Sequence, residues 1–286
     1  MSALHLSHYG PRERRQLYTE AAMTHNNTAL ALYSPLLNRV NPENCHALFA
    51  FSCFVPMFAF AAHGPNVESK SHSVSEVIEV FKLIRGAAFV VTQARPWIAS
   101  GGMSRLLTVE RMRERRSVRH HATAIYHLLH RLHEEQQQQQ QRQRGLDSSS
   151  YRSANSVVVH ATESLLNVLQ MCADNENGSV LLRWTAIVQS TFLDSLTQDE
   201  PMGLVLLGYF GAAIDFIIDN WWMDGWGRYL INLVSDRLRA GADSQEVVWA
   251  RYAMHQLESS NIDKTNGTLE ADEIRSHSGQ PLFTEH

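Results

Sequence analysis

The sequence predicts an all-α fold, a single multi-helix domain. Apolar residues recur at helical spacing along most of the chain, and no convincing two-residue alternation indicates a strand. The chain has 286 residues, of which 44% are hydrophobic and 19% are charged, so it can bury a sizeable core. We expect the folded domain to span residues 12–256, with a disordered Gln-rich insertion at 134–150 and a flexible polar tail at 257–286.

Composition excludes several classes of protein. A formal net charge of −4 is incompatible with a generally basic nucleic-acid coat. Three cysteines, Cys45, Cys53 and Cys172, are too few for a disulfide scaffold or a four-cysteine zinc site, and they fit a reducing compartment. The N-terminal sequence has no apolar stretch behind a basic one, so we expect no signal peptide.

The most apolar stretch, residues 45–62, contains no Asp, Glu, Lys or Arg and approaches the length of a membrane span. Pro56 and His46 interrupt it, and no Lys/Arg cluster flanks it. A second apolar run, residues 202–214, meets Asp215 too early to span a bilayer. We therefore predict buried core helices and no membrane span.

The first half of the chain predicts four helices. The first covers residues 12–37. The second is capped by Asn41 and stops at 63–65, because His-Gly-Pro is a strong breaker. The third starts at a capping box of Ser73 and Glu76 and is expected to end at Pro96. A turn at Gly101-Gly102 then precedes a basic, His-rich helix over residues 111–133.

The second half begins with the glutamine run of residues 136–141, which has no apolar periodicity and therefore predicts a flexible loop. Helicity resumes near Ala154 and continues to a turn at 174–178. A short helix is expected at 187–196.

Residues 202–222 are apolar on nearly every side, which predicts a helix at the centre of the protein. Gly208 and Gly211 reduce its helix propensity, so we expect either a neighbouring helix or a ligand to approach closely there. The chain breaks at 224–227, and a last amphipathic helix follows until Gly241 stops it.

Aromatic side chains crowd the Phe-rich helix and the end of the central helix. Ordinary core packing is one interpretation, and an apolar pocket between the two helices is the other. The candidate ligand-binding residues are Phe51, Phe54, Phe58, Gly208, Tyr209, Gly211, Trp221, Trp222 and Trp226.

Other candidate chemistries are weaker. His127, His130 and His133 have a spacing that could hold a metal, but nearby arginines would repel a cation, so we predict a solvated basic face. Residues 263–273 echo a calcium loop without its full ligand set. We expect no metal and no cofactor.

No catalytic or nucleotide-binding motif occurs, so we assign no catalytic residue. Asp215, Asp219 and Asp224 lie on or beside the central helix and could act as acids or bases, although helix-end capping explains them as well. Residues 105–144 contain nine arginines and four acidic residues, a patch that could bind phosphate groups weakly or direct nuclear import.

Four blocks, in order along the chain, resemble a known family. They are NPENCHALFAFSCFVPMFAFA, VIEVFKLIRGAAFVVTQARPWI, VLLRWTAIVQSTFLDSL and LGYFGAAIDFIIDNWWMDGWGRYLINLV. Together they resemble the C-terminal effector domain of fungal binuclear zinc cluster transcription factors, closest to the sterol uptake control protein type, over roughly residues 20–252.

The resemblance implies an all-α domain, dimeric in sterol-sensing members, with a pocket for a sterol-like ligand whose binding keeps the factor outside the nucleus. The family's N-terminal six-cysteine cluster is missing here, so we expect no direct sequence-specific DNA contact. The expected function is a transcriptional effector domain that senses a sterol-like ligand and controls sterol or secondary-metabolite genes, nuclear and shuttling from the cytoplasm. It would form a homodimer or a heterodimer with related regulators. The alternatives are an isomerase or cyclase acting on a lipophilic metabolite, and a dimerising inhibitor of full-length relatives.

Overall fold

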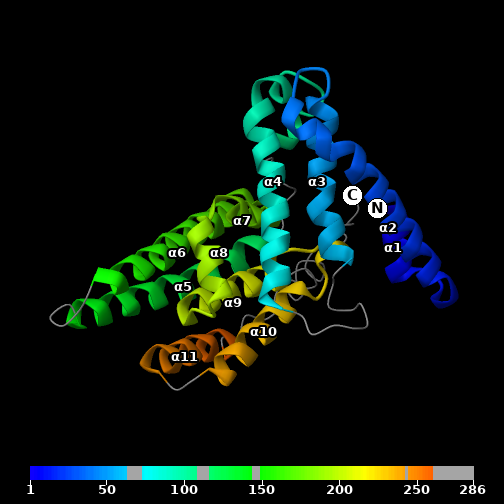
Figure 1. Ribbon diagram of the computed structural model, residues 1–286. Helices are drawn as coiled ribbons and strands as arrows, with labels where there is room; N and C mark the ends of the chain where they lie inside the picture. Colours follow the sequence, from blue (N-terminus) through cyan, green and yellow to red (C-terminus); the bar gives the residue numbers. More distant parts are fainter. Residues whose placement is uncertain (63–72, 108–115, 144–148, 242–243, 260–286) are drawn as a thin grey trace, which may run out of the picture.

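The computed structural model describes residues 1–62, 73–107, 116–143, 149–241 and 244–259 (Figure 1). Every regular element in these residues is helical, which confirms the predicted all-α class. The α-helices are α1 (Ser2–Tyr9), α2 (Arg15–Tyr33), α3 (Cys45–Ala62), α4 (Val74–Ala99), α5 (Arg116–Gln143), α6 (Ser149–Asn175), α7 (Arg183–Ile187), α8 (Ser190–Thr197), α9 (Pro201–Ile217), α10 (Trp226–Ala240) and α11 (Gln245–Ser259). Short 3-10 turns are η1 (Arg12–Arg14), η2 (Ser34–Arg39), η3 (Ser104–Leu107), η4 (Gly178–Leu182) and η5 (Trp221–Met223).

The main body surrounds α9, as the apolar sequence of that helix predicts. Residues 203–214 are all buried, and α5, α10 and α11 pack against α9. Pro201 takes the first helical position, and the Glu200 side chain accepts hydrogen bonds from the backbone N–H groups of Met202 and Gly203. The predicted stop at Gly241 is also confirmed, since this residue follows the last turn of α10.

A helical arm projects from this body (Figure 1). We define the arm as residues 15–62, which comprise α2, η2 and α3, together with residues 86–107 at the end of α4. Its upper part has a small hydrophobic cluster separate from the main core, formed by Cys45, Leu48, Phe49, Val90, Ala94 and Ile98. The lower ends of α3 and α4 join the main core instead, through side chains such as Phe58 and Phe81.

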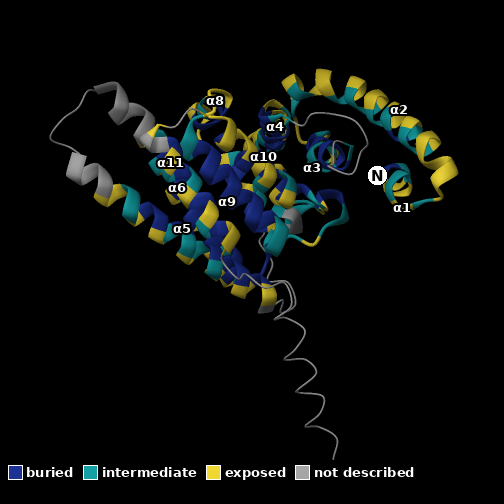
Figure 2. Cartoon of the chain, turned by 90° about the horizontal axis from the view of Figure 1, so that it is seen from below, coloured by how far each residue is buried: buried dark blue, intermediate teal, exposed yellow. Residues whose placement is uncertain are grey.

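The arm is much less buried than the body (Figure 2). Within α2 the single buried residue is Ala22. Of the Cys45–Ala62 segment, 44% is buried, so the predicted buried core helix is only partly buried in the structure. Among the described residues, α3 is the one helix long and apolar enough to cross a membrane by itself. Helices α8 and α9 would have to act together as a second span, and they are bent by 107°.

The capping predictions in the arm and at its base are confirmed. The Asn41 side-chain oxygen accepts hydrogen bonds from the N–H groups of Glu43 and Asn44, and α3 starts one residue later. The Ser73 hydroxyl accepts a hydrogen bond from the Glu76 N–H at the start of α4.

Several predicted boundaries are wrong. Helix α4 does not end at Pro96 but continues to Ala99, because a proline in the last turn removes only one backbone hydrogen bond. The glutamine run is not a loop, since α5 continues to Gln143, which reflects the good helix propensity of glutamine. The central helix ends at Ile217 rather than 222.

The folded region is also wider than residues 12–256. Helix α1 precedes it, and Leu4 in α1 is buried in the main core, while α11 continues to Ser259. The remainder of the predicted tail, with the calcium-like segment 263–273, lies outside the described residues.

Candidate ligand-binding site

The two glycines of α9 face neighbouring helices rather than open space. A Cβ atom on Gly208 would lie 2.6 Å from Met254 Sδ of α11. One on Gly211 would lie 2.8 Å from Leu230 Cβ and 3.0 Å from the Gly227 carbonyl oxygen, both in α10. The close approach that these glycines predict is therefore present, and helices α10 and α11 make it.

Gly227 of α10 faces α9 and allows the same close contact between the two helices. A Cβ atom there would lie 2.5 Å from both the Asp215 nitrogen and the Gly211 oxygen. These are backbone atoms of α9, which cannot move aside without distorting the helix. Two facing glycines thus let α9 and α10 pack backbone to backbone.

Tyr209, Trp222 and Trp226 are core residues. Burial raises the pKa of the Tyr209 hydroxyl well above its usual range. Trp226 donates a hydrogen bond of 2.8 Å from its indole nitrogen to the Phe60 carbonyl oxygen of α3, and its ring lies 5.2 Å from the Phe60 ring. Trp222 packs on the same phenylalanine at 5.7 Å. These tryptophans tie the base of the arm to the body.

Trp221 lies apart from the other two tryptophans. It is only partly buried, and its ring meets those of His5 and Tyr9 in α1 at 4.9 and 6.3 Å. This contact explains why α1 folds although its sequence has no strong apolar stripe.

The three candidate phenylalanines of α3 point in different directions. Phe58 is buried in the main core. Phe51 is half-buried, with its ring 4.8 Å from that of Tyr33 at the end of α2. Phe54 is 48% exposed. The nine predicted residues therefore do not surround one pocket: most are packed in the body, while Phe51 and Phe54 lie on the arm.

A polar group beside Phe51 was not predicted. Burial raises the pKa of the Tyr33 hydroxyl and of the Cys53 thiol, and the neighbouring Ser52 hydroxyl, which donates a hydrogen bond of 2.7 Å to the Phe49 carbonyl oxygen, offsets part of each shift. The Cys53 thiol is therefore protonated and a poor nucleophile. The apolar stripe of residues 12–37 includes Tyr33 but could not show that it faces the Phe-rich helix.

A hollow of about 590 Å³ lies on the body and is lined by Arg119, His120, Thr123, Ala124, His127 and Glu176. Arg119 forms an ion pair of 2.5 Å with the buried Glu176 carboxylate and donates a hydrogen bond to the Ala173 carbonyl at the end of α6. Glu176 itself has a φ of 51°, the left-handed conformation that ends a helix. Arg119 thus links α5 to the end of α6, and the Glu176 carboxylate compensates the positive charge of Arg119.

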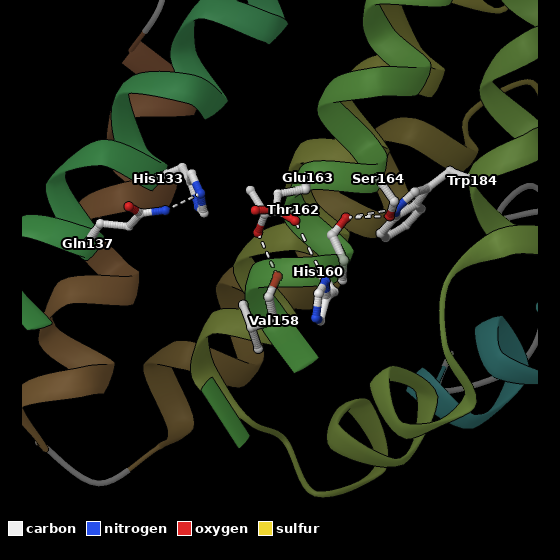
Figure 3. A network of polar contacts seen from close by, with 9 residues as sticks. His133, Gln137, Val158, His160, Thr162, Glu163, Ser164 and Trp184 are labelled. Carbon is white, nitrogen blue, oxygen red and sulfur yellow. Dashed lines mark hydrogen bonds and ion pairs between the residues drawn. The ribbon is translucent and has the colours of Figure 1, made fainter. Parts of the chain in front are cut away.

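The three spaced histidines of α5 have different surroundings. His127 lines the hollow, and His130 stacks on Tyr126. His133 is buried and lies 2.7 Å from the side-chain nitrogen of Gln137, while His160 and Glu163 form an ion pair on the facing helix α6 (Figure 3). The predicted solvated face therefore does not extend to His133, whose pKa burial lowers.

No protein-family model, no curated protein and no solved structure matches this chain. The assignment of a function therefore depends on the geometry described above and on the sequence blocks of the first section.

Proposed function

We propose that this chain is the effector domain of a transcriptional regulator that senses a lipophilic, sterol-like ligand through its arm. In this proposal it controls sterol or secondary-metabolite genes, shuttles from the cytoplasm to the nucleus and acts by binding rather than by catalysis. The resemblance of the four sequence blocks supports the class of regulator, and the arm supports the mode of action.

The main observation behind the proposal is that α2 is hardly buried. A ligand sensor needs an apolar surface and an element that can move over it. Helix α2 runs from Arg15 to Tyr33, yet Ala22 is its only buried residue. Since most helical stability in proteins comes from tertiary packing, such a helix is weakly held. It can therefore change position at low cost.

The side of α3 next to Tyr33 suits a sterol-like molecule. Phe51 and Phe54 offer apolar area that is not fully covered by protein. The ring of Tyr33 lies 4.8 Å from that of Phe51, and its hydroxyl could bind a single alcohol group, whereas the buried Ser52 hydroxyl already donates to the Phe49 carbonyl oxygen. A ligand bound here would be covered by α2 and would shift the population of α2 toward one position.

The test is hydrogen–deuterium exchange of residues 15–33 during titration with ergosterol, after native mass spectrometry of protein purified from a fungal host. We expect bound lipid in the native spectrum and slower exchange in α2 when ergosterol is added. Phe54→Ser should weaken binding by about tenfold, since it removes a large apolar contact.

The matched control is Val248→Ser, which replaces an exposed apolar residue of α11 in the body. It should bind ergosterol like the wild type. If neither ergosterol nor unrelated lipids alter exchange in α2, and no lipid copurifies, the chain is not a lipophilic-ligand sensor of this kind.

A second candidate, a dimerising inhibitor of related regulators, is favoured by one observation. Exposed apolar residues such as Leu32, Phe54 and Phe89 could form a helix–helix interface. Sedimentation that shows a dimer lost in Leu32→Ser, without any ligand effect, would favour it. The enzyme alternative has no comparable support, because the polar pair in the hollow, Arg119 and Glu176, is occupied in joining α5 to α6.

A further inference from the structure

The arm has very few charged residues. Residues 21–38 contain no Asp, Glu, Lys or Arg, and neither do residues 44–62. Between residues 86 and 103 the only charged side chain is Arg95. Surfaces that face water normally carry about a quarter of charged residues or more. The arm therefore has the composition of a surface that meets an apolar phase, although it lies outside the core.

Large apolar side chains are exposed on several sides of the arm. Phe89 and Trp97, 53% and 37% exposed, each precede a residue that is buried in the small arm cluster, so they lie on the flank of α4. Leu32, which is 70% exposed, belongs to α2. These side chains come from two different helices, and a lipid surface can accept apolar groups from both at once.

The tip of the arm combines aromatic and basic groups. We define the tip as η2 with the start of α3, residues 34–46, and the end of α4, residues 95–99. Trp97 and Leu36 are exposed there, and so are Arg39, Arg95 and the single acidic residue Glu43, so the tip carries one net positive charge. Tryptophan prefers the membrane–water interface, and arginines are attracted by anionic headgroups.

We propose that the tip of the arm inserts shallowly into the surface of an anionic lipid membrane, with Trp97, Leu36 and Phe89 in the interface and the two arginines at the headgroups. This binding uses residues of the tip and of the α4 flank, not the Phe51 and Phe54 side of α3, so it does not depend on the proposed function.

The packing of α3 argues for insertion rather than crossing. A membrane span would have to pull Phe49 from its contacts with α4 and Phe58 from the main core. It would also break the hydrogen bond between the Trp226 indole and the Phe60 carbonyl. Shallow insertion of the tip keeps all of these contacts and covers only side chains that are now exposed.

The experiment is flotation of the full chain with vesicles of phosphatidylcholine, alone or mixed with phosphatidylserine in equal parts. We expect the wild type to float with the mixed vesicles. The double variant Phe89→Ser/Trp97→Ser should bind about tenfold less or weaker still, because two large apolar side chains are lost. Arg39→Gln and Arg95→Gln should each reduce binding to mixed vesicles about fivefold.

Two further variants make the result specific. Val248→Ser and Ile187→Ser replace exposed apolar residues of the body and should float like the wild type. Brominated phosphatidylcholine should quench part of the tryptophan emission of the wild type, and Trp97→Phe should float but lose that quenching. All these positions are partly exposed, and circular dichroism melts check that the variants fold.

The proposal is overturned if the wild type floats with neither vesicle, or if the tip variants float as well as the body variants. It is also overturned if Trp97→Ser abolishes a dimer in sedimentation while the wild type shows no vesicle binding, since the tip would then be a protein interface.

Discussion

Helix α9 of the body and helix α3 of the arm are similarly apolar, but they are buried to very different extents. In the body, α9 is enclosed on every side, and even its glycines are in contact with α10 and α11. In the arm, α3 packs against α4 along one side, and Phe54 on another side is exposed. Apolar composition therefore does not distinguish an enclosed helix from a partly exposed one; the number of neighbouring helices decides.

The two regions also differ in how much their aromatic residues contribute to the folding free energy. Burial of aromatic groups in the body, where the rings of Phe81, Trp184 and Phe210 meet at 4.8 to 6.0 Å, supplies a large share of the folding free energy. The exposed aromatic residues of the arm contribute little to it. Substitutions in the two regions should therefore have different consequences.

The largest expected difference in the free energy of unfolding is between substitutions of two phenylalanines, one in the body and one in the arm. Phe210→Ala should reduce the free energy of unfolding by about 3–5 kcal/mol, because the side chain is fully buried and a cavity remains. Phe89→Ala should change it by less than about 0.5 kcal/mol, since the side chain is exposed. Urea denaturation followed by circular dichroism measures both, and similar losses would show that Phe89 is packed.

A smaller contrast is between two helical glycines. Gly227→Ala should destabilise the protein by about 1–3 kcal/mol, because its Cβ atom would collide with backbone atoms of α9. Gly86→Ala should stabilise it by about 0.5–1 kcal/mol, because nothing lies within 4 Å and alanine favours the helix. Thermal melts of both variants test this, and a loss at Gly86 would mean that the arm is more tightly packed than described.

The smallest expected effect is the pH dependence of the free energy of unfolding that His133 causes between α5 and α6. Burial lowers the pKa of His133 from 6.5; Glu163 and Glu134 oppose the shift and His130 adds to it. The unfolded chain then binds a proton that the native chain does not, so the free energy of unfolding falls as the pH drops through about 6.5.

His133→Leu removes this titration. Its free energy of unfolding should decrease less than that of the wild type between about pH 7.5 and about pH 5.5. The control His255→Leu replaces an exposed histidine of α11 and should follow the wild-type pH dependence. Identical pH dependence of wild type and His133→Leu would contradict the assignment.

Local sequence signals predicted several elements well. The run that is apolar on nearly every side predicted α9, the capping residues Asn41 and Ser73 predicted two helix starts, and Gly241 predicted the end of α10. It missed α1, whose fold depends on ring contacts with the distant Trp221.

The candidate site was harder to predict, for a physical reason. Gly208 and Gly211 correctly indicated a close approach, but a sequence does not tell whether a helix or a ligand makes it. Likewise the Phe-rich run indicated an apolar surface without showing which sides α4 leaves uncovered. The sequence pattern shows that a helix has an apolar face, but only the tertiary structure shows what packs against that face.

The contrast between α9 and α2 can be measured directly by hydrogen–deuterium exchange of the free protein. The account predicts that residues 203–214 exchange only through global unfolding, while residues 15–33 exchange orders of magnitude faster, because Ala22 is the only buried residue of α2. Protection of α2 equal to that of α9 in the free protein would contradict it, since the arm would then be a rigid part of the core.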